Sequence, residues 1–288
     1  MSDSGSPFSS TFRQHPHTKA IVHALLVLTV LLLVFPMLWM LSTSLKPIEQ
    51  TMSLPPEWLP KPPQWRNFRE TVAYIPFWTY TKNTLTICVL AAIGTTFSSA
   101  LVAYSFTRME WPGRDILFGL TLATMMVPFP VLMVPLYVMF KTLGWVGTMK
   151  PLWVPSFFGS AFNIFLLRQF FLRIPKSLPE AMSLDGASEL RVFLSIYLPL
   201  SKAPLAVAAF FQFIYSWNDF LGQMLFLTDQ DTFTLTVGLQ FYQSQLGGTQ
   251  WHYLMAASIM ITLPILVIFF FLQKTFLQGL SFMKNVDA

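Results

Sequence analysis

Five charged side chains gather within residues 177–204 of a chain that otherwise carries very little charge. Only 11% of its 288 residues are Asp, Glu, Lys or Arg, whereas 54% are hydrophobic. The chemistry open to such side chains is polar contact, either with water or with another protein. On the residues alone, residues 177–204 (the charged segment) are therefore either an ordinary loop or an element that a partner holds. The five are Glu180, Asp185, Glu189, Arg191 and Lys202.

Asp219 is a second candidate, because it is the one carboxylate placed well inside a predicted membrane span. An unpaired charge is costly in a membrane, so such a residue is a functional candidate by default. With Tyr215 one turn earlier and Asn218 beside it, Asp219 could line the path of a polar solute. The slightly favoured alternative is that Asp219 pairs or caps locally. Trp217 and Asn163 are further path candidates. Packing is the favoured interpretation for Trp217, and Asn163 could equally bridge helices.

Several catalytic and binding patterns are missing from the sequence. There is no GxxxxGK[ST] phosphate-binding loop and no HExxH motif, and the four histidines are dispersed. Cys88, the single cysteine, lies in an apolar run and excludes an internal disulfide. The net charge of +5 is scattered along the chain, which argues against nucleic acid as a partner. We therefore predict that the chain is not an enzyme and binds no cofactor or metal itself.

The elements that position these residues are predicted to be membrane helices. The mean hydropathy is +0.55, and about 20 apolar residues suffice to span a bilayer. Several of the apolar stretches contain proline, which membrane helices tolerate as kinks. We predict an all-α membrane protein with six transmembrane helices. The predicted spans are 20–42, 83–106, 116–140, 151–171, 203–227 and 252–273.

The distribution of basic residues predicts the orientation. With the N-terminus inside, the cytoplasmic pieces hold eleven of the 18 Lys and Arg residues and the outer pieces hold seven. Residues 228–251, with two Asp and no Lys or Arg, are the clearest outer loop. The charged segment then lies in the cytoplasm, between the fourth and fifth spans. The predicted parts are a flexible cytoplasmic tail (1–19), the membrane domain (20–274) and a cytoplasmic C-terminal tail (275–288).

Local signals divide the charged segment into two short helices. Ser177-Leu-Pro-Glu180 fits a capping box at the start of the first helix. Asp185-Gly186 is a pair that readily turns the chain. The second helix is predicted to be amphipathic and to stop at Pro199. Its apolar residues at helical spacing are Leu190, Phe193, Leu194 and Tyr197.

The charged segment resembles the "EAA" signature of permease subunits of ABC importers. The matching positions are Glu180, Ala181, Asp185, Gly186, Ala187, Ile196, Pro199, Leu200 and Pro204, and Met182 stands where the family has a second alanine. The resemblance implies a coupling helix that docks in a cleft of the ATP-binding subunit. It implies polar contact by Glu180, an apolar plug of Leu178, Ala181, Met182 and Leu184, and an angle set by Asp185 and Gly186.

The resemblance covers most of the chain and points to the carbohydrate-uptake branch, in particular to its maltose- and glycerol-phosphate-type second permeases. In those maltose-type permeases the C-terminal tail reaches the ATPase, but here the ending Ser-Phe-Met-Lys-Asn-Val-Asp-Ala departs from the family pattern. The matching segments are Ser44-Leu45-Lys46, Trp65-Arg66-Asn67-Phe68, Asn83-Thr84-Leu85, Leu167-Arg168-Gln169-Phe170-Phe171, Trp217-Asn218-Asp219-Phe220, and Gln273-Lys274 with Phe276, Gly279 and Leu280.

The resemblance implies a type I ABC-importer permease fold in a bacterial or archaeal cell membrane, with both termini cytoplasmic. It implies a second permease subunit as pseudo-two-fold partner, two ATP-binding subunits that carry ATP and Mg, an extracytoplasmic solute-binding protein and membrane lipid. The solute would be a sugar, an oligosaccharide or a polyol-phosphate. The alternative class is a stand-alone secondary transporter or channel, which usually needs more intramembrane carboxylates than Asp219 alone. A polytopic membrane enzyme is disfavoured by the missing catalytic motifs.

Overall fold

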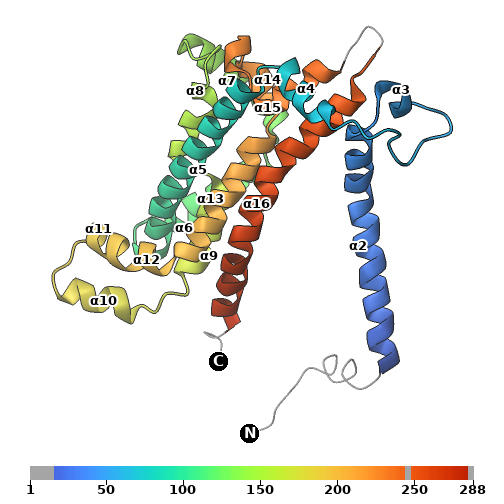
Figure 1. The fold of residues 1–288 in the computed structure, drawn as a ribbon. Helices are drawn as coiled ribbons and strands as arrows, with labels where there is room; N and C mark the ends of the chain where they lie inside the picture. The colour runs from blue at the N-terminus through green and yellow to red at the C-terminus, as the bar shows by residue number, and fades with distance from the viewer. Residues whose placement is uncertain (1–15, 244–247, 285–288) are drawn as a thin grey trace. The chain divides into compact units, whose positions relative to one another are not determined.

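The structure, a computed structural model, describes residues 16–243 and 248–284, and within them all regular structure is helical (Figure 1). The prediction of an all-α chain is confirmed for this part. The longer helices are α2 (Pro16–Ser44), α4 (Arg66–Tyr74), α5 (Phe77–Arg108), α6 (Arg114–Ala123), α7 (Phe129–Thr142), α9 (Ala161–Phe171), α10 (Ser177–Leu184), α13 (Lys202–Asn218) and α16 (Trp251–Lys284). The short ones are α3 (Ile48–Thr51), η1 (Thr124–Met126), α8 (Lys150–Trp153), η2 (Val154–Phe158), α11 (Glu189–Val192), the π-helix η3 (Phe193–Tyr197), α12 (Leu198–Leu200), α14 (Leu221–Phe226), η4 (Gln230–Thr232), α15 (Leu235–Gly238) and η5 (Leu239–Tyr242).

The chain forms two compact units, one from residues 1–71 and 243–259 and the other from residues 72–242 and 260–288. In the first unit, Lys46 is 1% exposed, and its Nζ lies 4.1 Å from the centre of the Trp39 ring. Asn67 Nδ2 donates to the carbonyl oxygens of Ser44 and Lys46, both at 2.9 Å. Two of the matching sequence segments thus pack against each other where α2 ends.

In the described part of the chain, three single helices are long and apolar enough to cross a membrane, and the number is five if each of two bent helix pairs is counted as one span. The three are Lys19–Ser44, Phe77–Arg108 and Trp251–Lys274. The pairs are Arg114–Met126 with Phe129–Thr142, bent by 99°, and Glu189–Leu200 with Lys202–Asn218, bent by 81°. Two of the predicted spans are not single helices. Span 151–171 is divided among α8, η2 and α9, and span 203–227 is interrupted between α13, which ends at Asn218, and α14, which begins at Leu221.

Proline and glycine explain these breaks. Pro128 has an extended conformation and precedes α7, so the apolar run from 116 to 140 turns there. Gly159 has φ +89°, a left-handed conformation that glycine adopts without strain, and it separates η2 from α9. Pro36 and Pro264 lie within α2 and α16 without ending them, as membrane helices allow.

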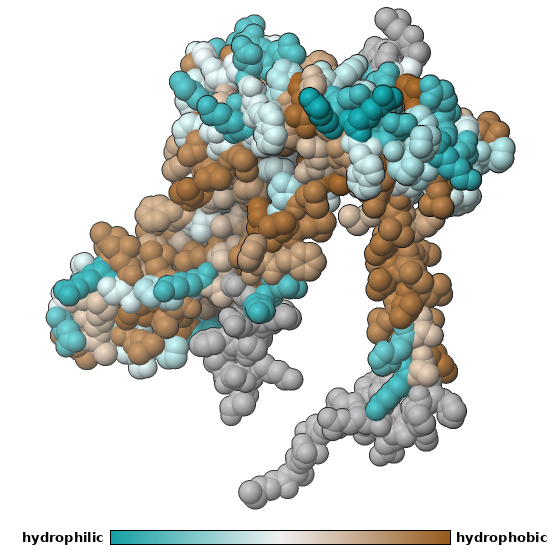
Figure 2. Space-filling model, viewed as in Figure 1, coloured by the Kyte–Doolittle hydropathy of each residue, from teal (hydrophilic) through white to brown (hydrophobic). Residues whose placement is uncertain are grey.

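The core of the second unit is formed by α5, α9 and α13, which pack against one another (Figure 1). Small residues permit close packing: Ala91, Ala100, Ala103 and Ala208 are each 0% exposed. A Cβ atom on Gly94 would lie 2.4 Å from the Phe157 ring, so this contact requires glycine. Over the middle of these helices the surface is hydrophobic, as expected beside lipid (Figure 2).

Helices extend into both predicted terminal tails, as far as the structure describes them. Residues 16–19 of the predicted N-terminal tail already belong to α2, and residues 1–15 lie outside the described part. Helix α16 continues through Lys284, so residues 275–284 of the predicted C-terminal tail are helical. Residues 285–288 lie outside the described part.

Candidate functional site

The charged segment begins as α10 and turns sharply at Gly186, where the predicted helix end is confirmed. Gly186 has φ +79°; its N–H donates to Ser183 O at 3.0 Å, and the Ala187 N–H donates to Met182 O at 3.1 Å. This pair of hydrogen bonds is a Schellman motif, which caps the last carbonyls of a helix and favours glycine at its left-handed position. The motif fixes the direction in which the chain leaves α10 for α11.

The capping box predicted at Ser177 and Glu180 is wrong. Lys176 already has helical dihedral angles (φ −62°, ψ −26°), and its carbonyl oxygen accepts the Glu180 N–H at 3.1 Å. Ser177 therefore lies inside the first turn and makes no capping hydrogen bond. The serine that caps is Ser188, whose Oγ accepts the Arg191 N–H at 3.4 Å at the start of α11.

The second helix of the charged segment does not stop at Pro199 as predicted. It passes through the π-helix η3, closed by the Leu198 N–H donating to Phe193 O, and α12 contains Pro199. Its apolar residues also divide into two groups. Phe193 and Tyr197 are 1% and 3% exposed, whereas Leu190 and Leu194 are 62% and 48% exposed. One group belongs to the core and the other is free for contact.

The first helix divides in the same way. Met182 and Ala187 pack against a core cluster built from α5, α9, α11, η3 and α13, so the structure places Met182 on the inner side. Leu178 and Leu184 are 47% and 89% exposed, and Ala181 is exposed between them. The carboxylate-bearing residues Glu180 and Asp185 are exposed as well. On its free surface the charged segment thus combines leucine side chains with carboxylates, and Figure 2 shows hydrophobic and hydrophilic residues mixed over α10 and α11.

Two residues of α5 hold the charged segment. The Tyr104 hydroxyl donates to Glu189 Oε2. Arg108 Nη2 lies 3.9 Å from Glu189 Oε1 and donates to Ser183 Oγ at 3.4 Å. The exposed fractions are 25% for the Arg108 side chain and 44% for that of Glu189, so the ion pair alone stabilises little. The Tyr104 hydrogen bond is part-buried and adds a second link to the same carboxylate.

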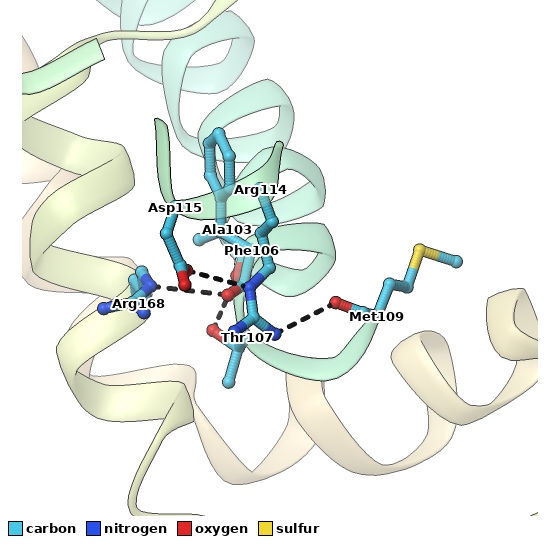
Figure 3. A network of polar contacts seen from close by, with 7 residues as sticks. All are labelled: Ala103, Phe106, Thr107, Met109, Arg114, Asp115 and Arg168. Carbon is cyan, nitrogen blue, oxygen red and sulfur yellow. Dashed lines mark hydrogen bonds and ion pairs between the residues drawn. The ribbon is translucent and has the colours of Figure 1, made fainter. Parts of the chain in front are cut away.

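The Arg108 end of α5 is itself anchored to neighbouring elements (Figure 3). Arg168 of α9 donates through Nε to Phe106 O at 3.4 Å, and its guanidinium lies 4.3 Å from the centre of the Phe118 ring. Arg114 Nη1 donates to Met109 O at 3.3 Å, and its Nε lies 3.1 Å from Asp115 Oδ1. The end of α5 that contacts the charged segment is therefore also linked to α9 and to the start of α6.

The second unit also contains a cavity of about 480 Å³, in the size range of ligand pockets. Its walls are mainly apolar and aromatic. On one side it is lined by Gln212, Tyr215 and Ser216, which share one face of α13 because they are three or four positions apart, and by Asp219, which directly follows the helix. Asn218 lies beside a shallower pocket with Tyr215 and Asp219. Three of the predicted path residues are thus brought together.

Two other predicted path residues are buried elsewhere. Trp217 is 3% exposed and stacks on Phe213, with ring centroids 5.6 Å apart. Asn163 of α9 is 2% exposed, and within the described residues its Oδ1 has no hydrogen-bond partner. Neither residue lines the cavity. In the described part of the chain, no three His, Cys, Asp or Glu side chains are grouped so that they could hold a metal ion.

Comparison with known protein families identifies the family to which the chain belongs. Residues 96–281 match the family described as "Binding-protein-dependent transport system inner membrane component". The chain belongs to this permease family. The family consists of transport components, which confirms that the permease is not itself an enzyme.

Relatives with carbohydrate-related names align over most of the permease. The diacetylchitobiose uptake system permease protein NgcG of Streptomyces coelicolor is 31% identical over 91% of this chain and 87% of its own. The sn-glycerol-3-phosphate transport system permease protein UgpE of Yersinia pestis is 31% identical over 90% and 94%. The arabinooligosaccharides transport system permease protein AraQ of Halalkalibacterium halodurans is 33% identical over 71% and 73%. All three are named as permease components of transport systems.

A solved structure shares the fold of the permease. It is a chain of a bacterial ABC transporter involved in the import of the acidic polysaccharide alginate. The two chains superpose with a TM-score of 0.78, and the match covers 95% of the permease and 99% of that chain. At 22% identity, this likeness concerns the fold alone.

The residues that stabilise the break after α13 were not predicted from the sequence. The last carbonyls of a helix need outside donors. Gln223 Nε2 donates to Ser216 O at 3.0 Å, and Thr236 Oγ1 donates to Trp217 O at 2.9 Å. Gln223 is 1% exposed and accepts a hydrogen bond from the Thr234 hydroxyl. A glutamine in an apolar run was the available signal, but its partners lie 7 positions before it and 11 positions after it in the chain.

Asp219 accepts a local hydrogen bond, and two substitutions can separate this structural role from any role of its negative charge. Its Oδ1 accepts the Gly222 N–H at 3.0 Å at the start of α14. We expect Asp219→Ala to lower the stability of the permease by about 1 kcal/mol, because the capping acceptor is lost. Asp219→Asn keeps an acceptor oxygen, so stability and solute uptake should both remain near wild type. The measurements are thermal unfolding in detergent and uptake into membrane vesicles; loss of uptake by a fully stable Asp219→Asn variant would show that the charge itself is required.

Proposed function

We propose that this permease is a membrane subunit of an ATP-driven ABC importer for a carbohydrate, and that the charged segment is its docking element for an ATP-binding subunit. The observation that carries the proposal is the free surface of α10 and α11. Leu178, Leu184 and Leu190 are exposed there beside carboxylates. They lie in the segment that connects α9 to α13. Exposed apolar side chains rimmed by polar groups are typical of a protein interface.

The residues of the charged segment have separate roles in this proposal. Leu178, Ala181 and Leu184 supply the apolar plug, and Glu180 makes polar contact at its rim. Asp185 and Gly186 set the angle between α10 and α11 through the Schellman motif. Met182 and Ala187 support the plug from the inside, where they pack against the core.

The proposed assembly contains a second permease subunit, two ATP-binding subunits that bind ATP and Mg, and an extracytoplasmic solute-binding protein. The three named relatives support a sugar, an oligosaccharide or a polyol-phosphate as solute. We propose six membrane crossings in a bacterial or archaeal cell membrane, with both termini and the charged segment in the cytoplasm. The excess of basic residues in the inner pieces supports this orientation.

In this proposal, each subunit contributes part of the solute path. The cavity lined by Tyr215 and Asp219, with Asn218 beside it, is this subunit's share. Nucleotide-dependent closure of the ATP-binding subunits moves the charged segments, and alternating access follows from rocking of the helix bundles. This permease needs no nucleotide site for that movement, because the energy enters through the docking element.

The proposal is tested by purifying the tagged permease from its native membranes in mild detergent. We expect an ATP-hydrolysing subunit to co-purify, and vesicles that contain the complex to take up radiolabelled solute only when ATP is supplied on the side of the ATPase. The probes are a panel of radiolabelled mono- and oligosaccharides and glycerol phosphate. Purification without any ATPase, together with solute flux in ATP-free liposomes containing this permease alone, would establish a secondary transporter or channel instead.

A further inference from the structure

The charged segment is directly continuous with α13, but α13 is poorly built to transmit its movement. The chain bends by 81° between Glu189–Leu200 and Lys202–Asn218. Helix α13 then ends at Asn218, and α14 starts only at Leu221. A bend at one end and a break at the other are places where backbone dihedral angles absorb a displacement.

Helix α5 has neither interruption. It runs unbroken over 32 residues from Phe77 to Arg108 and contains no proline. Near the Arg108 end, Tyr104 and Arg108 hold the charged segment through Glu189 and Ser183. The Tyr104 ring is fixed from the side by the π-helix: its centroid lies 4.8 Å from that of Tyr197 and 5.2 Å from that of Phe193. A displacement of Glu189 therefore acts on Tyr104, whose ring is buried and held in place by Phe193 and Tyr197.

The other end of α5 holds the loop that follows α14. Asn83 Nδ2 donates to Asp231 O at 2.8 Å and to Phe233 O at 2.9 Å. Thr84 Oγ1 accepts the Leu235 N–H at 2.9 Å. Asn83 is 7% exposed and Thr84 is 1% exposed, so water does not compete readily for these hydrogen bonds. The loop backbone is thus attached to α5 at three points.

We propose that α5 is the rigid element that couples the charged segment to residues 231–235, with Tyr104 and Asn83 as the positioning residues at its two ends. The two residues are about 31 Å apart along the helix at 1.5 Å rise per residue. A rigid element whose two ends are both bonded to movable segments couples those segments in both directions. The inference rests on the proposed function, because nucleotide binding by the ATPase is what displaces the charged segment.

The test uses the assembled transporter in liposomes with a spin label on Gln230→Cys, next to the attached loop. Gln230 is exposed, whereas the native Cys88 is 0% exposed and lies out of reach of the label. The measurement is the change in label mobility on adding ATP and Mg²⁺. Tyr104→Phe keeps the ring contacts and removes the hydrogen bond to Glu189. Tyr137→Phe is the matched control, because Tyr137 lies in α7, outside both attached ends.

The label on residue 230 has one mobility without ATP and another with ATP, and the ratio of the two populations in the presence of ATP gives an equilibrium constant. We expect Tyr104→Phe to lower this constant by about tenfold, while ATP hydrolysis continues. Asn83→Ala should lower it similarly from the opposite end, and Tyr137→Phe should leave it unchanged. Mutations this far apart normally act independently. The double variant Tyr104→Phe/Asn83→Ala should nevertheless be no worse than either single variant, because both interrupt one connection.

A wild-type response in Tyr104→Phe, or losses that multiply in the double variant, would overturn the role of α5. Co-purification of the ATPase is measured first in every sample, so this failure is distinct from failure of the proposed function. If the wild-type permease retains no ATPase, the docking role is overturned, and the coupling through α5 with it.

Discussion

Replacing Gly186 with valine is expected to stop ATP-driven uptake while the permease still inserts in the membrane. At φ +79° a β-branched residue is strained, although no atom lies within 4 Å of the added Cβ. The strain is about 1–2 kcal/mol or more, so the native angle between α10 and α11 becomes about tenfold rarer or worse. With a different angle between α10 and α11, Leu184 and Leu190 can no longer contact the same ATP-binding subunit at the same time. The measurement is uptake into membrane vesicles, with the amount of inserted permease determined in parallel.

Two variants control for strain and for side-chain size. Gly186→Asn should keep most of the uptake, because asparagine tolerates the left-handed conformation. Gly144→Val places the same strain in a second Schellman motif, where Gly144 has φ +67° and donates to Lys141 O at 3.0 Å at the end of α7. This variant should retain the co-purifying ATPase, whereas Gly186→Val should lose it. Normal uptake by Gly186→Val would show that the angle is not needed for coupling.

The sequence predicted the parts of the fold that depend on composition along the chain. Hydropathy was sufficient for α2, α5 and α16, because a run of about 20 apolar residues has few other uses. Kinks at proline were expected from the sequence, and Pro128 does interrupt the predicted span 116–140, since proline restricts both its own φ and the residue before it. Asp185-Gly186 correctly indicated the turn after α10.

Features set by tertiary contacts could not be read from the sequence. Met182 and Leu184 are both apolar and two positions apart, yet one is packed inside and the other is 89% exposed. Tyr104 lies in an apolar run, and its partner Glu189 is 85 positions away. Ser177 satisfies the capping pattern, but the turn at Pro175-Lys176 already starts the helix. Ser177 is therefore not the N-cap residue. In each case the deciding group is distant in sequence or belongs to the backbone.

Replacing Leu184 with glutamate is expected to detach the ATPase without affecting the fold. The side chain makes no core contact that the substitution would remove, since it is 89% exposed. In the docked complex it would be buried, and a carboxylate in an apolar cleft is strongly unfavourable. We expect about 100-fold weaker binding, which corresponds to about 3 kcal/mol. Thermal unfolding of the isolated permease should stay at the wild-type temperature.

Leu54→Glu is the matched control, because Leu54 is 91% exposed but lies far from the charged segment in sequence, between α3 and α4. The most direct test of the docking role is the molar ratio of ATPase to permease after purification of wild type, Leu184→Glu and Leu54→Glu under identical conditions. The docking role predicts that wild type and Leu54→Glu keep the same ratio and that Leu184→Glu loses nearly all of the ATPase. An unchanged ratio in Leu184→Glu, with the permease folded, would contradict it.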